Sequence, residues 1–279
     1  MSKKAKYPVD LHCHTTASDG TLKPADLVDL AAGRGLRAIG LTDHDTIEGW
    51  NAAEKAAQKI GITLIKGIEI NTDWQGREIH ILGYGMDGDN ISFKNHLYDL
   101  QEKRVLRVKK IIDKLTGLGL EISFEEVNGF SKGESIGRPH VAQALVKKGY
   151  VENTQMAFNY FLKIGAPAYV PRYKLHPEQA VRIIRNAGGV AILAHPGAQE
   201  ISFKQIHELV TAGLQGIEIC HPDHSPEQII TYKKIANSLG IIATGGSDYH
   251  GPEIKKDIEI GDWGVSMEDL ANLLQIYDR

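Results

Sequence analysis

The strongest constraint in this chain is an alternation of short apolar runs with longer amphipathic stretches. The apolar runs are a few residues long and rich in Ile, Val and Leu, as buried parallel strands are. They cover Val9–His12, Ala38–Thr42, Thr63–Ile70, Glu78–Tyr84, Val190–Ala194, Gly216–Cys220 and Ile241–Thr244. Strand–helix alternation predicts a parallel sheet or barrel. Seven such runs fit an incomplete (β/α) barrel better than an open two-sided sheet, so we expect an α/β barrel.

The alternation is interrupted between residues 87 and 165, where no convincing strand is found. Apolar residues mark one face of a long helix: Leu97, Leu100, Val108, Ile111, Ile112 and Leu115. The other face is basic: Lys103, Arg104, Arg107, Lys109, Lys110 and Lys114. We predict a barrel of residues 1–86 and 166–279, with a helical insert at 87–165 covering the active site. A basic helix face is usually solvated surface, and guidance of an anionic substrate is the alternative.

Composition excludes several classes of protein. The net charge of -3 gives no global attraction to DNA or membranes, and no apolar stretch reaches the roughly 20 residues of a membrane span. The charged start lacks the apolar segment of a signal peptide. Cys13 and Cys220 are too few for a disulfide framework, so we expect reduced thiols in a cytoplasmic protein with no membrane association and no obligate protein partner.

Histidines and carboxylates gather where the predicted strands end. His12 and His14 are two residues apart on an extended segment, so both side chains point to the same side and Cys13 to the other. The same residue types recur after or within later strands, at Asp19, His44, Glu69, His80, His195, Asp248 and His250. Each alone has an ordinary structural explanation, but together they do not, because burying polar groups at strand ends is costly unless they are used. Active sites of (β/α) barrels lie at these ends.

These ligand types predict a metal-dependent phosphoesterase. Imidazole and carboxylate without thiolate suit Mn²⁺, Zn²⁺ or Fe²⁺. The nine candidates fit roughly two or three ions at three or four protein ligands each. Such sites activate a bridging hydroxide and clamp phosphoryl oxygens. Asp43 and Asp45, beside His44, are expected to orient ligands from behind.

A set of short motifs resembles the PHP domain family (polymerase and histidinol phosphatase) in order along nearly the whole chain. The motifs are His12-Cys13-His14-Thr15, Ser18-Asp19-Gly20, Gly40-Leu41-Thr42-Asp43-His44-Asp45-Thr46, Gly67-Ile68-Glu69-Ile70, Glu78-Ile79-His80-Ile81-Leu82-Gly83-Tyr84, His195-Pro196 and Gly246-Ser247-Asp248-Tyr249-His250. The resemblance implies a distorted (β/α)7 barrel with a trinuclear metal centre. It assigns one ion to His12, His14, Glu69 and Asp248, a second to Glu69, His80 and His195, and a third to Asp19, His44 and His250.

Within that family, the insert and Gly137-Arg138-Pro139-His140 resemble the stand-alone branch that acts on nucleotides. Its substrates are 3′,5′-bisphosphonucleotides, AMP-like compounds or short RNA ends, with phosphate as product. Arg138 would hold phosphate beside a helix start, and Arg172 could meet an anion. The family often has a substrate-side histidine after strand six, best matched by His224 and less well by His221. With Asp248 and Arg138, His224 completes the predicted catalytic set.

Some alternatives stay open. The leaving alcohol could be protonated by a metal-bound water or by His224. The protein could be a histidinol-phosphate phosphatase, or a module that binds metal and nucleotide without catalysis. Amidohydrolase-type cleavage uses similar barrels, and fold similarity alone does not decide the chemistry.

Overall fold

A computed structural model describes residues 4–131, 136–173, 175–199 and 201–277. It divides the chain into two compact units, Met1–Asn95 with Lys174–Arg279, and His96–Tyr173. The second unit starts and ends later than the predicted insert, 87–165. The difference arises because the first residues of helix α3 (Ile91–Gly117) belong with the first unit, while residues 169 and 170 accept hydrogen bonds from α3.

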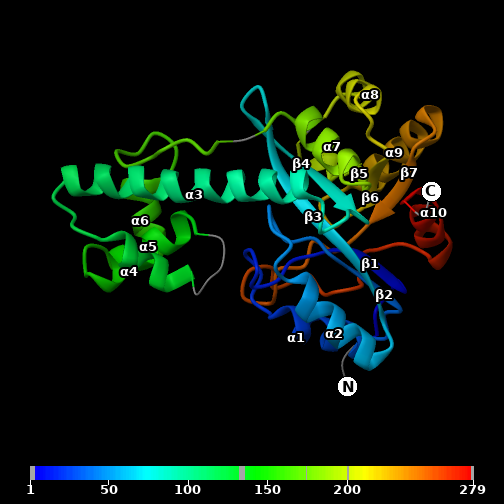
Figure 1. The fold of residues 1–279 in the computed structure, drawn as a ribbon, viewed down its shortest axis with the longest axis horizontal. Helices are drawn as coiled ribbons and strands as arrows, with labels where there is room; N and C mark the ends of the chain where they lie inside the picture. The colour runs from blue at the N-terminus through cyan, green and yellow to red at the C-terminus, as the bar shows by residue number, and fades with distance from the viewer. Residues whose placement is uncertain (1–3, 132–135, 174, 200, 278–279) are drawn as a thin grey trace. The chain divides into compact units, whose positions relative to one another are not determined.

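The first unit is built on a seven-stranded sheet whose spatial order follows the sequence. Its strands are β1 Val9–Cys13, β2 Ala38–Leu41, β3 Thr63–Trp74, β4 Arg77–Tyr84, β5 Val190–Leu193, β6 Gly216–Cys220 and β7 Ile242–Gly245. Helices flank the strands: α1 Pro24–Gly33, α2 Trp50–Ile60, α7 Pro177–Asn186, α8 Phe203–Thr211, α9 Pro226–Leu239 and α10 Met267–Tyr277, with a short η2 at Pro196–Ala198 (Figure 1). The predicted strands are all present, and the predicted α/β barrel is confirmed.

One strand differs from the parallel arrangement that the alternation favours. β4 runs antiparallel to both β3 and β5, while the other neighbouring pairs are parallel. Gln75 and Gly76, between β3 and β4, have φ values of 55° and 85°. Two consecutive left-handed residues form the tight turn that suits a twisted hairpin. The two strands are therefore a hairpin with no crossover helix.

The two edges of the sheet nearly meet. The segment after β7 runs alongside the end of β1, and the His14 N–H donates to the Tyr249 carbonyl at 2.9 Å. Gly246 approaches β1 so closely that a Cβ there would lie 2.4 Å from the His12 nitrogen, which only glycine avoids. The Asp10 carboxylate also joins the two segments, because it accepts the Ser247 N–H at 2.9 Å. This closure brings the loop after β7 over the end of β1.

The first unit buries apolar side chains together with a set of polar ones, among them Asp10 and His12. Every residue of β1, β2 and β5 is buried. One core cluster joins strand residues to α10, and includes Val9, Ile192 and Leu273. Cys13 and Cys220 are free cysteines, and none of the described helices is long and apolar enough to cross a membrane.

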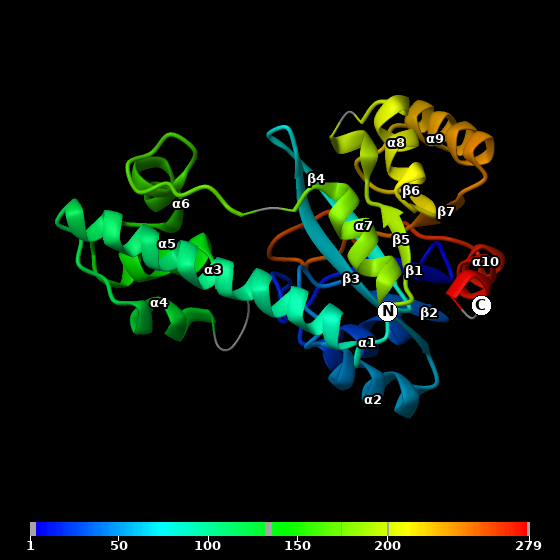
Figure 2. The same cartoon turned by 45° about the horizontal axis from the view of Figure 1, so that its top comes forward.

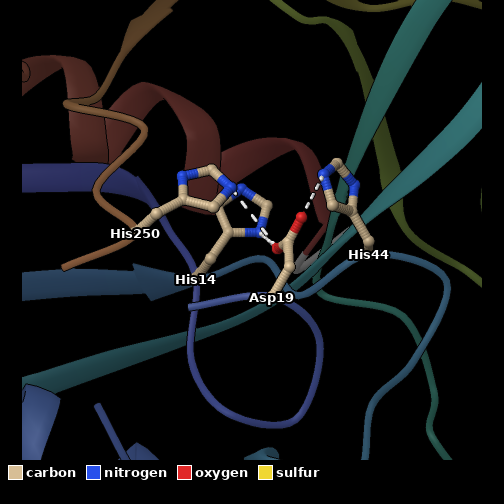
Figure 3. Close-up of side chains that lie close together, drawn as sticks. All are labelled: His14, Asp19, His44 and His250. Carbon is tan, nitrogen blue, oxygen red and sulfur yellow. Dashed lines mark ion pairs between the residues drawn. The ribbon is translucent and has the colours of Figure 1, made fainter. Parts of the chain in front are cut away.

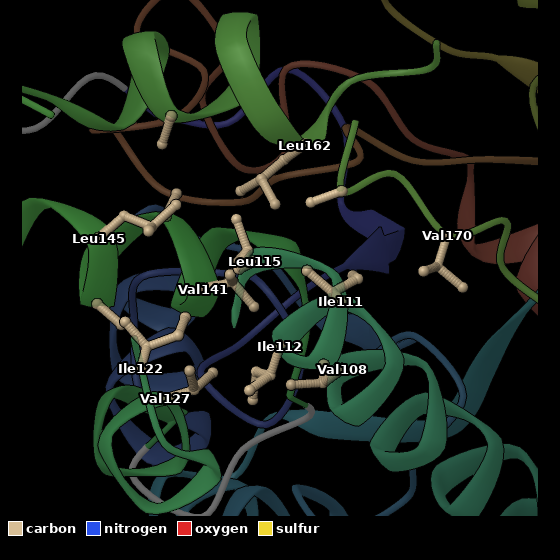
Figure 4. Close-up of a cluster of buried hydrophobic side chains, with 14 of the residues drawn as sticks. Val108, Ile111, Ile112, Leu115, Ile122, Val127, Val141, Leu145, Leu162 and Val170 are labelled. Carbon is tan, nitrogen blue, oxygen red and sulfur yellow. The ribbon is translucent and has the colours of Figure 1, made fainter. Parts of the chain in front are cut away.

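The second unit has its own core. Helix α3 is followed by α4 Phe124–Ser131, α5 Arg138–Lys147, α6 Thr154–Ala157 and η1 Phe158–Leu162 (Figures 1 and 2). The predicted apolar face of α3 is buried, and its Ile111 and Leu115 pack with Val141 and Leu145 of α5 (Figure 4). Helix α4 was not expected from the sequence, because its short pattern, Phe124 to Ser131, has few apolar residues.

Candidate metal centre

All nine predicted ligands lie in the first unit, on its strands or in the loops that follow them. His12 lies on β1, Glu69 on β3 and His80 on β4, while His14, His44, His195, Asp248 and His250 follow strand ends and Asp19 lies in the turn after β1. Because β4 is antiparallel, its C-terminal end lies at the other edge of the sheet from those of its neighbours. His80 therefore comes from the middle of β4, opposite Asn71. The structure brings all nine side chains into one network of close contacts.

Glu69 is the hub of this network and is 1% exposed. Its Oε2 lies 3.3 Å from His12 Nε2, 3.2 Å from His14 Nε2 and 3.1 Å from His44 Nδ1. His12 Nε2 and both ring nitrogens of His14 are buried without a hydrogen-bond partner in the described part of the chain. Buried polar atoms are rarely left without partners. Lone pairs that converge beside a carboxylate are what a divalent cation requires, so these residues fit a metal site.

The second oxygen of Glu69 has its own histidines. Its Oε1 lies 2.7 Å from His80 Nδ1 and 3.1 Å from His195 Nε2. One carboxylate therefore has imidazoles at both of its oxygens, so each oxygen could contribute to holding a divalent ion.

Asp248 closes the other side of the cluster. Its Oδ1 lies 3.1 Å from His14 Nε2 and 3.4 Å from His12 Nε2. Its Oδ2 contacts Lys255 Nζ at 2.5 Å. Asp248 and His195 have φ values of 51° and 24°, in the left-handed region that disfavours residues with a side chain. Such backbone strain is common where a site fixes the position of a side chain, which agrees with the contacts of Asp248 and His195 in this cluster.

Asp19 belongs to a third group. Its carboxylate points between His44 on one side and the stacked rings of His14 and His250 on the other (Figure 3). Its Oδ1 lies 3.3 Å from His250 Nε2, and its Oδ2 lies 3.7 Å from His44 Nε2. Four residues from three separate segments thus offer ligand atoms within 4.8 Å of one another.

The charges of the cluster hold its carboxylates ionised. Burial alone would raise the pKa of Glu69, but His80, His44 and His12 hold it well below its usual range. Burial, aided by the nearby charges of His14 and His80, lowers the pKa of His44 to about 3. Against the effect of burial, Asp248 and Glu69 raise the pKa of His14 to about 10, and Glu69 raises that of His80 to about 9, so an ion that binds these imidazoles would displace their protons.

Asp43 and Asp45 support the ligands as expected. Asp43 accepts hydrogen bonds from the Ser18 hydroxyl at 2.6 Å and the Thr15 hydroxyl at 2.7 Å, which fixes the loop that carries Asp19. Asp45 accepts from the Asn71 side chain at 3.1 Å, and that amide group also lies 3.1 Å from His44 Nδ1.

Glu218 of β6 is a functional candidate that the sequence reasoning missed. Its Oε1 lies 3.0 Å from His12 Nδ1, and its Oε2 accepts the His195 N–H at 2.9 Å. A carboxylate at Nδ1 holds the proton there and leaves Nε2 free to face Glu69 and Asp248. A signal was present, because Gly-Ile-Glu-Ile occurs both at 67–70 and at 216–219. In both segments a single acidic residue stands within an apolar strand.

Replacing Glu218 with Gln should weaken metal binding by about 10- to 100-fold, because a neutral amide no longer anchors the His12 imidazole. Metal content after dialysis against graded chelator measures this. Glu227→Gln, which makes the same charge change at the exposed start of α9, is the control and should bind metal as the parent does. Equal metal retention by both variants would show that Glu218 does not support the site.

The predicted substrate-side residues fall into two groups. His221 is buried, and its Nε2 lies 3.7 Å from Asp248 Oδ2. His224 has backbone partners on both ring nitrogens, the Ile219 carbonyl at 2.8 Å and the Gly197 N–H at 3.0 Å. Arg138 and Arg172 belong to the second unit. Their roles stay predictions.

Comparison with known proteins identifies the family. A model of the PHP domain matches residues 10–190. The chain belongs to the PHP domain family. A 5′-3′ exoribonuclease of Haemophilus influenzae is 35% identical, with 94% of this chain and 97% of that protein covered. A 3′,5′-nucleoside bisphosphate phosphatase of Chromobacterium violaceum is 34% identical, with 88% and 87% covered.

A solved structure extends the similarity to the fold. A metal-dependent phosphoesterase structure from Bifidobacterium adolescentis superimposes with a TM-score of 0.84 at 30% identity, covering 98% of this PHP chain and 97% of the other. The predicted family, fold and enzyme class, a metal-dependent phosphoesterase, are confirmed by these relatives together with the buried ligand cluster.

Proposed function

We propose that this PHP protein removes phosphate from nucleotides, either 3′,5′-bisphosphonucleotides or AMP-like compounds, or from the ends of short RNA. The main support for this proposal is the buried carboxylate of Glu69, which has imidazole nitrogens facing both of its oxygens. That arrangement suits ions side by side, which stabilise the attacking and leaving oxygens in phosphoryl transfer. The relatives named for bisphosphonucleotides and RNA support the substrate class.

The ligand atoms form groups that suit two or three divalent ions, with Mn²⁺, Zn²⁺ or Fe²⁺ as the candidates. We assign His12, His14, Glu69 and Asp248 to one ion, Glu69, His80 and His195 to a second, and Asp19, His44 and His250 to a third. Two of the contact groups, His12 His14 Glu69 Asp248 and His14 Asp19 His44 His250, contain the first and third sets. Such ions activate water at neutral pH and neutralise phosphoryl oxygens.

The protein's own residues then position those ions and the substrate. Glu218 fixes the ring of His12, and the Asp43 hydrogen bonds fix the loop of Asp19. Because both ring nitrogens of His224 are engaged by the backbone, we favour water, and not His224, as the proton donor to the leaving alcohol. His224 then positions the Gly197 turn beside His195.

Arg138 is the proposed phosphate contact of the second unit. Its Nη1 donates to the Leu162 carbonyl at 3.2 Å, which holds the guanidinium in place. Replacing Arg138 with Met should lower kcat/KM by about 10- to 100-fold, as loss of a charge-assisted hydrogen bond does. Steady-state phosphate release measures this, with Lys148→Gln, at the other end of α5, as the control. An unchanged kcat/KM for Arg138→Met would exclude Arg138 from substrate binding.

A substrate screen tests the proposal. Purified protein with its metal is assayed for phosphate release from 3′,5′-bisphosphoadenosine, AMP, 5′-phosphorylated short RNA and histidinol phosphate. We expect turnover of a nucleotide or RNA end and little of histidinol phosphate. Preference for histidinol phosphate would replace the proposed substrate, and absence of any turnover by fully metal-loaded protein would favour a binding module.

A further inference from the structure

The second unit carries a row of cationic side chains where α3 meets the extended segment 169–173. Lys103 Nζ lies 3.6 Å from the centre of the Tyr173 ring, Arg107 Nε donates to the Val170 carbonyl at 2.9 Å, and Lys114 Nζ donates to the Tyr169 carbonyl at 2.7 Å. Spacings of four and seven residues place these three side chains on one face of the helix. The predicted basic face of α3 is therefore not uniformly solvated, since part of it is ordered against a second segment.

Two further arginines join this row. The Arg138 guanidinium lies 5.8 Å from the centre of the Tyr169 ring and 5.7 Å from that of Phe158. Partial burial, followed by the charges of Arg138, Arg172 and Arg104, lowers the pKa of Arg107 to about 10. We call Lys103, Arg107, Lys114, Arg138 and Arg172 together the cationic face.

Arg107 and Arg138 bring two like charges together, and the backbone carbonyls to which they donate do not neutralise them. On solvated helices, basic residues commonly pair with acids one turn away, as Lys103 does with Asp99 here. Arg107 and Arg138 instead donate to backbone carbonyls, and neither has an ion pair with a carboxylate among the residues that the structure describes. Repulsion between neighbouring guanidinium groups costs free energy, which a bound anion would recover.

Aromatic rings accompany the cationic side chains. Tyr173, whose ring faces Lys103, is 47% exposed, and the rings of Phe158 and Tyr169 stand beside Arg138. Proteins that bind single-stranded nucleic acid combine a positive groove along the backbone with aromatic rings on which bases stack. Inorganic phosphate alone would not require the rings.

We propose that the cationic face binds the phosphodiester backbone of a single-stranded oligonucleotide, with Arg107 as its central phosphate contact. This proposal rests on the proposed function in one respect, the purpose of the binding. That purpose is to hold a strand longer than one nucleotide. It adds Arg107, Lys103 and Lys114 to the substrate residues and favours oligonucleotides over free nucleotides as the preferred ligands.

The test is binding of a fluorescein-labelled short oligouridylate to the full chain, followed by fluorescence anisotropy with chelator present to prevent turnover. Arg107→Gln should weaken binding by about tenfold, as loss of a hydrogen bond to a charged group does. Arg107→Lys should bind with an affinity between those of the parent and Arg107→Gln, because lysine keeps the charge but lacks the planar guanidinium. Lys147→Gln, which removes one exposed charge from α5 in the same unit, should bind like the parent.

Salt dependence makes the test independent of whether Arg107→Gln folds. Each phosphate contact to a single strand contributes about 0.7 to the slope of log Kd against log salt, so we expect about 2 or more for the parent. A duplex of the same sequence should bind more weakly, because its bases are not free to stack. A parent slope near zero, equal binding by Arg107→Gln, or equal binding of duplex and single strand would overturn the proposal.

Failure here differs from failure of the proposed function. Phosphate release with oligonucleotide binding that ignores Arg107 would reject only the cationic face as a binding site. Arg107-dependent binding without phosphate release from any substrate would reject only the proposed function.

Discussion

Asp248→Asn should lose bound metal and lower phosphate release by about 10³-fold or more, the scale on which loss of a central electrostatic group acts. Asparagine keeps the size of the side chain but removes the charge that faces His12 and His14 at 3.4 and 3.1 Å. It also leaves Lys255 without the carboxylate that it contacts at 2.5 Å. Elemental analysis and phosphate release on the same preparation measure both effects.

Asp257→Asn is the matched control for this substitution. It makes the same change in the same loop after β7, at an exposed position. We expect parental metal content and turnover from it. If Asp248→Asn kept full metal content and full activity, Asp248 would be neither a ligand nor a catalytic residue.

Glu69→Gln should have the second large effect, loss of at least one bound ion and a fall in turnover of about 10²-fold or more. The carboxylate faces imidazoles on both oxygens, so an amide can place an acceptor toward only one group and turns an N–H₂ toward the other. Metal content, phosphate release and circular dichroism distinguish loss of metal from loss of fold.

Glu54→Gln is the control for Glu69. It removes the same charge from a surface ion pair with Lys66, at 2.8 Å, and exposed pairs of this kind contribute little. Parental activity is expected. Retention of all bound metal by Glu69→Gln would mean that Glu69 does not bridge ions.

The proposed metal ligands could be predicted from the sequence because their signals are local. His12 and His14 share one side of an extended segment through simple alternation, and the closing loop after β7 adds Asp248 at the same edge. A polar residue at the end of an apolar strand is visible without a structure. The contacts of these residues with Glu69 confirm that the strand ends meet.

Other features depend on contacts between distant segments. The antiparallel direction of β4 follows from the left-handed turn at Gln75-Gly76. The apolar pattern of a short strand is the same in both directions, so it does not predict which way the strand runs. The support that Glu218 gives His12 joins residues 206 positions apart. The cationic face likewise exists only where 169–173 lies against α3, so a helical pattern alone could not separate it from solvated surface.

Removal and return of metal shows whether phosphate release depends on ions bound at this centre. Protein stripped with chelator is titrated with Mn²⁺, Zn²⁺ or Fe²⁺ while bound metal and phosphate release from 3′,5′-bisphosphoadenosine are followed together. We predict that the stripped protein is inactive and that activity returns with bound metal, reaching its plateau at two or three ions per chain. Full phosphate release by demonstrably metal-free protein would mean that the histidine and carboxylate cluster is not a catalytic metal centre.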